Sequence, residues 1–186
     1  HRWMSDVRVA LNFDARGSGG SAVMFDTSEG NRPLVSALAA AAPHPITSSL
    51  FYEVSRRLGH ATDLRPFKEA GIPSLNFAFS DESVNYHTPR DDLAHLDMRS
   101  VQHLGAQALA LARHFGAAPL PLPTAGDDIS FEAGMGAVIH YPRGLSVPFA
   151  LLVLAAAALV ARWACRERLA SPRGLARGAA VFALVS

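Results

Sequence analysis

One stretch of the sequence, Gly144 to Ala161, carries no charged residue over eighteen positions and is dominated by Val, Leu and Ala. At 1.5 Å of rise per residue this stretch makes a helix of about 27 Å, close to the roughly 30 Å hydrocarbon thickness of a bilayer. Tyr141 and Trp163 flank it, as aromatic residues do at membrane interfaces. The alternative is an Ala-rich helix in a protein core, but such a helix rarely stays free of polar residues on every face. We therefore expect a transmembrane helix over residues 144–163.

The segment that follows this helix is strongly basic. Five arginines lie after the apolar stretch, at positions 162, 166, 168, 173 and 177, whereas only Arg143 lies just before it. Because positively charged loops stay in the cytoplasm, we expect residues 164–178 to form a cytoplasmic loop. The domain before the helix then faces the periplasm, the exterior or an organelle lumen, and the protein is integral to a lipid bilayer. Residues 179–186 are apolar again and are expected to begin a second transmembrane helix.

The overall composition excludes some classes of site. The 17 basic and 16 acidic residues nearly cancel, and the first hundred residues show no basic face interleaved with aromatics, so no nucleic-acid partner is expected. The single cysteine, Cys165, allows neither an intrachain disulfide nor a cysteine-rich zinc site, so any metal must be held by His and carboxylate side chains. The sequence starts at His1 and stops inside an apolar run, so we expect a piece of a longer protein. No pattern indicates the oligomeric state.

Residues 1–118 alternate between strand-like and helix-like patterns. The expected strands are Val7–Asp14, Ala22–Phe25 and Ser74–Phe79, and the expected helices are Pro33–Ala42, Ser48–Leu58, Pro66–Ala70 and a long helix that Asp97 caps and that ends near Phe115. This alternation favours an α/β fold with a largely parallel sheet covered on both faces, a three-layer α/β/α sandwich. Residues 119–143 read as a Pro-rich linker and a possible small hairpin around Gly134–Gly136.

Two short motifs carry side chains suited to metal chemistry. In Asn12–Gly17 an acid, Asp14, ends a strand before a glycine-rich turn, and ligands bind at that edge of open α/β sheets. In Tyr86–Asp92, His87 follows the Ser74–Phe79 strand, and neutral imidazole is a common zinc ligand. Taken singly, each motif is also compatible with an ordinary turn. Six other histidines show no spacing with a second donor and are expected to face solvent or cap helices: His44, His60, His95, His103, His114 and His140.

The chain resembles a known family in four features that occur in a fixed order. These are the strings NFDARGSGG, TDLRPFKEAGIPSLNFAF and NYHTPRDDLAHLD, and then a long amphipathic helix. Residues 1–118 look like the second half of the aminopeptidase-type di-zinc exopeptidases, family twenty-eight of the metallopeptidases. The similarity is greatest to the membrane-anchored branch that includes vacuolar membrane protease-like proteins. It implies that the N-terminal half of the sandwich is missing from this chain.

The resemblance assigns roles to individual residues. It implies that Asp14 is a ligand of one zinc ion and His87 a ligand of the other, and that Tyr86 donates a hydrogen bond to the tetrahedral intermediate. Asp63, and either Asp91 or Asp92 beside His87, are expected to orient the ligands without binding the metal, although a helix N-cap is the preferred alternative for Asp63. The two zinc ions would activate a water for attack on the peptide bond. The glutamate that acts as general base is expected outside this chain, so this segment alone should be inactive.

Three interpretations remain open at this point. The first is a membrane-anchored zinc metallo-exopeptidase, aminopeptidase-like, that acts on peptides outside the cytoplasm. The second is a peptidase-like ectodomain that has lost its metals and serves as a binding or structural module of a membrane protein. The third is an unrelated α/β domain tethered to a membrane.

Overall fold

A computed structural model describes residues 2–58 and 62–185 and divides the chain into two compact units, residues 1–143 and 144–186. We describe each unit separately. His60, one of the histidines expected to face solvent, lies outside the described residues.

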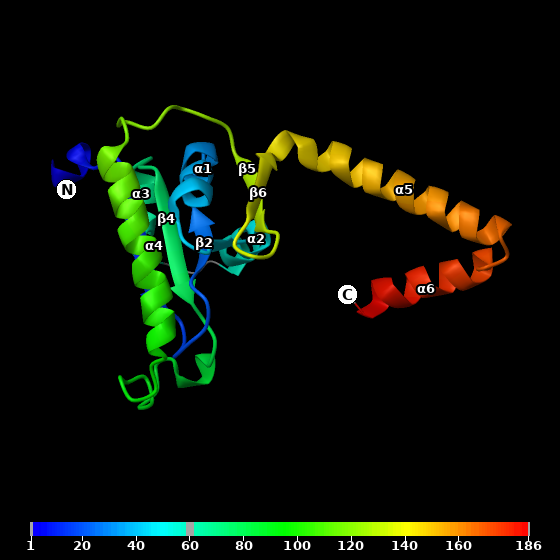
Figure 1. The fold of residues 1–186 in the computed structure, drawn as a ribbon, viewed down its shortest axis with the longest axis horizontal. Coiled ribbons are helices and arrows are strands. Elements are labelled where there is room, and N and C mark those ends of the chain that lie inside the picture. Colours follow the sequence, from blue (N-terminus) through cyan, green and yellow to red (C-terminus); the bar gives the residue numbers. More distant parts are fainter. Residues whose placement is uncertain (1, 59–61, 186) are drawn as a thin grey trace. The chain divides into compact units, whose positions relative to one another are not determined.

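The first unit is built on a four-stranded sheet in the order β1-β4-β2-β3, of which β4 and β2 are labelled in Figure 1. The strands are β1 (Ala10–Ala15), β2 (Val23–Thr27), β3 (Ile46–Thr47) and β4 (Ser74–Phe79). The pairs β1–β4 and β2–β3 are parallel, whereas β2 runs antiparallel to β4 with a bulge between Met24 and Asp26. The expected α/β class is confirmed, and the sheet is mixed rather than wholly parallel.

Helices lie on both faces of this sheet (Figure 1). One face is covered by α1 (Arg32–Ala41) and α4 (Met98–Ala117), and the other by α2 (Ser49–Leu58) and the short α3 (Arg65–Glu69). The short 3-10 helix η1 (Arg2–Asp6) precedes β1. As predicted, Asp97 caps α4, since its side chain accepts a hydrogen bond from the backbone N–H of Arg99. This cap satisfies one of the N–H groups that every helix start leaves unpaired.

The larger core lies under α1 and α4. Every residue of β4 is buried, and its side chains alternate between the two faces, as they must in a strand. Leu75 and Phe77 enter the core with Leu38 of α1 and Leu111 of α4, and the ring of Phe77 stacks on that of Phe13 at 4.9 Å. The opposite face carries polar residues as well as a smaller apolar cluster. Burying Leu75 and Phe77 stabilises the fold by about 1.5–3 kcal/mol per side chain.

The α2 helix is amphipathic, as the sequence predicts, but its apolar residues face solvent among the described residues. Leu50, Phe51 and Val54 are 69%, 51% and 44% exposed. Its other side lies beside β2 and α3, where the ammonium group of Lys68 is 5.5 Å from the ring of Tyr52 and pairs with Asp26 at 2.7 Å. An exposed apolar helix face of this kind is characteristic of a surface that another segment covers.

A hairpin follows the Pro-rich linker. Its strands are β5 (Asp128–Glu132) and β6 (Val138–Pro142), paired antiparallel. Gly134, Met135 and Gly136 turn the chain with positive φ angles of 93°, 55° and 76°. Because two of these positions are glycine, the left-handed backbone costs little there.

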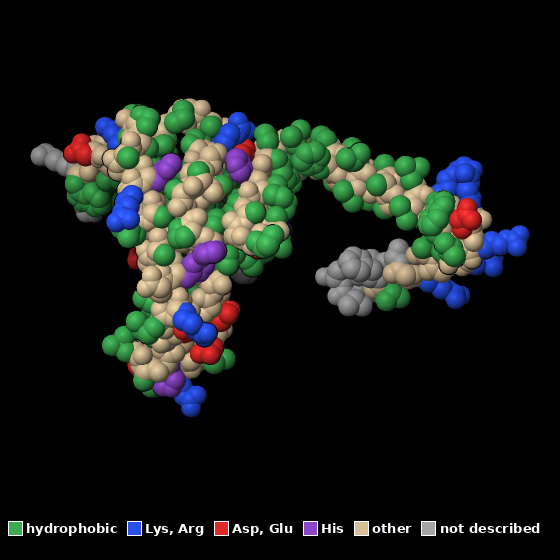
Figure 2. All heavy atoms as spheres, viewed as in Figure 1, with side chains coloured by type: hydrophobic (Ala, Val, Ile, Leu, Met, Phe, Trp, Pro, Cys, Tyr) green, Lys and Arg blue, Asp and Glu red, His purple; other side chains and the backbone are tan. Residues whose placement is uncertain are grey.

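The second unit contains α5 (Ser146–Arg166) and α6 (Pro172–Val185), and the one-turn η3 (Arg143–Leu145) leads into it. The helix from Arg143 to Arg166 contains an 18-residue stretch with a mean hydropathy of 2.4, and none of that stretch is buried, so by length and composition this helix can cross a membrane. Lys and Arg side chains gather where α5 ends and α6 begins (Figure 2). The basic stretch 164–178 is not all loop, because α6 already begins at Pro172 after Ser171, whose hydroxyl accepts from the N–H of Gly174.

Candidate metal centre

Asp14 lies at the carboxyl end of β1, opposite Ala78 of β4. Because β1 and β4 are parallel, the loops that follow both strands leave the sheet at the same edge. The Asp14 side chain is exposed and accepts a hydrogen bond from the N–H of Ala15 at 2.7 Å. A carboxylate oriented in this way at a sheet edge is accessible to a cation.

The loops after β1 and β4 are held together directly. Gly19 and Asp81 exchange two backbone hydrogen bonds, of 3.3 and 2.9 Å. The side-chain amide of Asn85 donates to the hydroxyl of Ser18 at 3.0 Å, and both residues are buried. Gly17 lies so close to the carbonyl oxygen of Asp81 that a Cβ atom would clash with it. The structure therefore brings the loop of the first motif to the loop of the second.

His87 follows the short helix η2 (Ser83–Asn85) in the second of these loops. It adopts the left-handed region with φ 57°, and its ring stacks on that of Tyr86 with the centroids 3.9 Å apart. Both side chains are exposed. A non-glycine residue in this region costs free energy and is concentrated at functional sites. The stacked pair presents an imidazole nitrogen and a phenol oxygen together.

The two neighbouring acids, Asp91 and Asp92, bond to other groups of the loop rather than to the imidazole of His87. Asp91 accepts a hydrogen bond from the backbone N–H of His87 at 3.1 Å, not from its ring. Asp92 is paired with the ring of His95 at 2.7 Å. This hydrogen bond from His95 lowers the pKa of Asp92 below its ordinary value, so the Asp92 side chain stays ionised.

Asp63 is exposed and precedes α3. The cap position of that helix is Leu64, and no side chain caps it. The N-cap hypothesis for Asp63 is therefore wrong, and its expected role near the metal ligands stays a prediction. Asp63 could be the N-cap only if the helix started at Leu64, one residue earlier than it does.

The donor set is compatible with zinc but incomplete. A carboxylate and an imidazole are both ordinary zinc ligands, and Asp14 and His87 are both accessible. Among the residues that the structure describes, no group of three or more His, Cys, Asp or Glu side chains could hold a metal ion. If zinc binds at this edge, the remaining ligands must come from residues other than those described.

Two histidines expected to face solvent or cap helices take part in contacts between distant elements instead. His103 of α4 accepts from the N–H of Ala22 at 3.1 Å, and its other ring nitrogen lies 3.0 Å from the carbonyl of His44. His140 lies 2.8 Å from the buried carboxylate of Asp128. These contacts join residues that are far apart in the sequence or on facing strands, so no local spacing reveals them.

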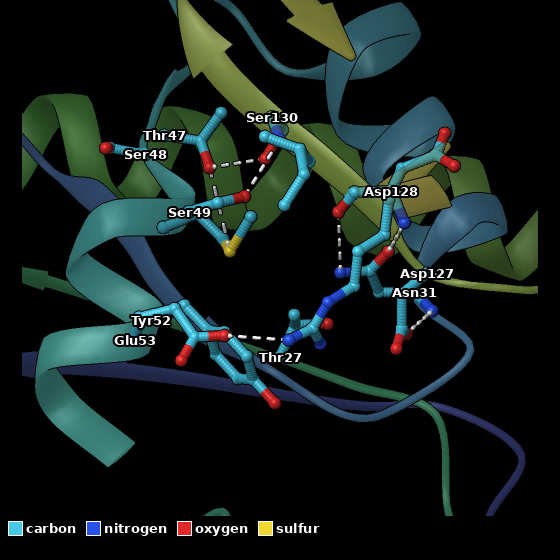
Figure 3. A pocket seen from close by; sticks show the side chains of 13 residues that line it. Thr27, Asn31, Thr47, Ser48, Ser49, Tyr52, Glu53, Asp127, Asp128 and Ser130 are labelled. Atoms are coloured by element: carbon cyan, nitrogen blue, oxygen red, sulfur yellow. Dashed lines mark hydrogen bonds and ion pairs between the residues drawn. The ribbon is translucent and has the colours of Figure 1, made fainter. Parts of the chain in front are cut away.

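A second polar site lies between α2, α1 and the hairpin (Figure 3). Around it Thr47 and Ser130 share a hydrogen bond of 3.3 Å, and Arg143 reaches Glu53 at 3.4 Å. The enclosed space is about 20 Å³, which suits one water molecule rather than a substrate. None of the residues predicted to bind metal lines it. Its polar groups anchor the hairpin to the domain.

The α/β sheet carries a carboxylate, Asp14, and an imidazole, His87, in loops at the same carboxyl edge. Domains with this arrangement are candidates for metal binding. The chain belongs to peptidase family M28, whose family model matches residues 1–112. This membership confirms the resemblance seen in the sequence and excludes an unrelated α/β domain.

Several curated proteins are similar to the chain. It is 35% identical over 117 residues to endoplasmic reticulum metallopeptidase 1 of Mus musculus, which covers 61% of this chain and 13% of the mouse protein. It is 32% identical to the Homo sapiens protein of the same name, over 76% of this chain and 16% of that protein. The vacuolar membrane protease of Clavispora lusitaniae is 29% identical over 72% of this chain and 13% of its own length.

The chain thus spans about one seventh of the length of these relatives. No solved structure matches it.

Proposed function

We propose that the intact protein is a membrane-anchored zinc metallo-exopeptidase of aminopeptidase type. The observation that carries this proposal is the joining of the Asp14 loop and the His87 loop at one sheet edge, in a chain of peptidase family M28. The names of its relatives, a metallopeptidase of the endoplasmic reticulum and a vacuolar membrane protease, support a peptidase in a membrane. The substrate would be a peptide.

In this proposal Asp14 and His87 each hold one of two zinc ions. Bound there, zinc supplies Lewis-acid chemistry that polarises the peptide carbonyl and activates water. The general base would come from outside this chain. Asp91 positions the ligand loop by accepting the N–H of His87, and the Gly19–Asp81 pairing fixes the distance between the two loops. Small displacements matter, because the partners that orient metal ligands affect affinity about 10–100-fold.

Tyr86 is the second side chain proposed to act on the substrate. Its ring stacks on that of His87, which fixes both side chains relative to each other. A phenol in this place donates a hydrogen bond to the oxygen that becomes negatively charged as the peptide bond is attacked. Loss of such a donor costs about 100–1000-fold in kcat.

The membrane part of the proposal rests on the helix from Arg143 to Arg166. Its length and hydropathy suit a span, and the arginines that follow support a cytoplasmic location for its far end. The peptidase domain would then lie in the periplasm, outside the cell or in an organelle lumen.

A second candidate function stays open, because the described residues alone do not complete a group of three metal donors. If the rest of the protein also lacks ligands, the domain would be a metal-free binding or structural module. The intact protein distinguishes the two. Hydrolysis of an aminoacyl-arylamide with a free amino terminus is expected, together with loss of activity in chelator, recovery with zinc, and no hydrolysis of the N-acetylated compound. A folded protein that hydrolyses neither compound would support the module.

A further inference from the structure

The β5–β6 hairpin has two faces of opposite character. On one face Asp128 and Ser130 are 4% and 2% exposed and point into the domain. On the other face Phe131 and Ile139 are directly paired across the strands and are 40% and 47% exposed, and Met135 at the tip is fully exposed. Hairpins on domains surrounded by water normally place apolar residues inward and polar residues outward. This hairpin does the reverse at Asp128, Ser130, Phe131 and Ile139, whereas Val138 on the inward face packs against the core.

The buried polar residues of the inward face, Asp128 and Ser130, are paired with other groups of the domain. Asp128, whose side chain is 2% exposed, lies 2.8 Å from Arg32 and 2.8 Å from His140. The N–H of Ser130 donates to the hydroxyl of Ser49 at 2.8 Å. Burying a carboxylate is costly unless it is paired, and these contacts provide the pairs. The polar face is therefore committed to α1 and α2, and the hairpin has no freedom to turn its apolar face inward.

The hairpin that carries the apolar face comes directly before the candidate membrane helix in the sequence. The strand β6 ends at Pro142, and α5 begins at Ser146. Four residue steps span at most about 14 Å, so the end of the hairpin stays within that distance of the start of the apolar helix. Phe131 and Ile139 lie about 10 Å further along the strands, at 3.4 Å per residue. Water-exposed aromatic and aliphatic side chains this close to a span lie within reach of the headgroup region.

We propose that Phe131, Met135 and Ile139, here called the hairpin patch, form a lipid-contacting surface in the interfacial region of the bilayer. Figure 2 shows hydrophobic side chains at the surface over β5 and β6. Aromatic and aliphatic groups gain free energy by leaving water for the boundary between headgroups and acyl chains. The polar anchors of the hairpin transmit this contact to the domain, so the patch fixes the orientation of the domain at the membrane. The inference rests on the proposed membrane span and on no part of the proposed catalysis.

Spin labels in the intact protein test this. The protein is reconstituted into phosphatidylcholine vesicles, with Cys165→Ser and any other cysteines replaced, and carries one label at Phe131→Cys or Ile139→Cys. Two control sites are matched to it: Leu93→Cys, in a loop where Leu93 is 84% exposed, and Leu154→Cys, inside the apolar helix. Collisions of each label with lipid-soluble oxygen and with a water-soluble nickel chelate are compared by power saturation.

The proposal expects the oxygen-to-nickel ratio at positions 131 and 139 to lie several-fold above that at position 93 and below that at position 154. A ratio equal to that at position 93 would mean that the hairpin patch faces water and would overturn the proposal. Labels that neither reagent reaches would mean that protein covers the patch, a result that also overturns it. A water-like ratio at position 154 would show instead that the span itself is wrong, and hydrolysis of arylamides would report the catalytic proposal separately.

Discussion

The side-chain amide of Asn85 donates a hydrogen bond to the hydroxyl of Ser18 across 3.0 Å, although 67 positions separate the two residues. Both residues are buried, with exposures of 7% and 4%. Ser18 follows β1 and Asn85 follows β4, so this bond fastens the loop after Asp14 to the loop that carries His87. We infer that it sets the separation of the two proposed zinc ligands.

Replacing either partner should therefore weaken zinc binding. In the intact protein, Ser18→Ala leaves the Asn85 amide buried without its partner and is expected to lower zinc affinity about 10–100-fold. Titration with a competing chelator, well below the unfolding temperature, measures this. Ser83→Ala removes an exposed hydroxyl from the same loop and serves as the control. Equal zinc affinity in both variants would show that the Ser18–Asn85 hydrogen bond does not position the ligands.

Gly17 should tolerate no side chain. A Cβ atom at this position would overlap the carbonyl oxygen of Asp81, so Gly17→Ala forces the two loops apart and should destabilise the fold by about 1–3 kcal/mol. Gly105, on the exposed side of α4, has open space around it, and Gly105→Ala should raise stability by about 0.5–1 kcal/mol. Thermal unfolding of the two variants in detergent measures both shifts. A stable Gly17→Ala protein would mean that the loops are less closely packed.

Asp128 is expected to be the most sensitive residue of the hairpin. Asp128→Ala removes the buried partner of both Arg32 and His140 and should cost about 2–3 kcal/mol, since Arg32 is partly exposed and can recover some hydration. Glu69→Ala, which breaks an exposed pair with Arg65, should leave the unfolding midpoint almost unchanged. Indistinguishable unfolding of the two variants would contradict the anchoring role of Asp128.

The sequence predicts the local elements of this fold better than their pairings. The segment Ser74–Phe79 is predicted from its sequence to be a strand, and it is β4 with those bounds. The antiparallel position of β2 beside β4 depends on contacts across the sheet, which local periodicity does not encode.

The hairpin shows the same limit at the level of single residues. The alternation of Asp128 and Ser130 with Ile129 and Phe131 is readable from the sequence and separates two faces. Which face turns inward depends on Arg32, nearly a hundred positions earlier, and for this reason the role of His140 was not predicted. For the candidate metal centre, both loops can be recognised from the sequence, whereas the hydrogen bond between Ser18 and Asn85 that joins them cannot.

The orientation of the chain in the membrane can be tested with single cysteines in a Cys165→Ser background. Thr124 lies exposed in the linker before the apolar helix, and Leu169 lies after it, 70% exposed. When only the cytoplasmic side is open to an impermeant maleimide, Leu169→Cys should react and Thr124→Cys should not, because positive charge stays in the cytoplasm. The opposite result would reverse the orientation, and reaction at both positions would argue against a span.

The central claim, that the His87 loop holds zinc for peptide hydrolysis, is tested most directly by the zinc content of the intact protein. Elemental analysis of wild type, His87→Ala and His95→Ala is combined with arylamide hydrolysis. His95 is the matched control because it is an exposed histidine in the same loop that pairs with Asp92. We expect about two zinc ions per chain in wild type and His95→Ala. For His87→Ala we expect zinc loss and activity reduced by more than about 100-fold. Full zinc and activity in His87→Ala would contradict the account.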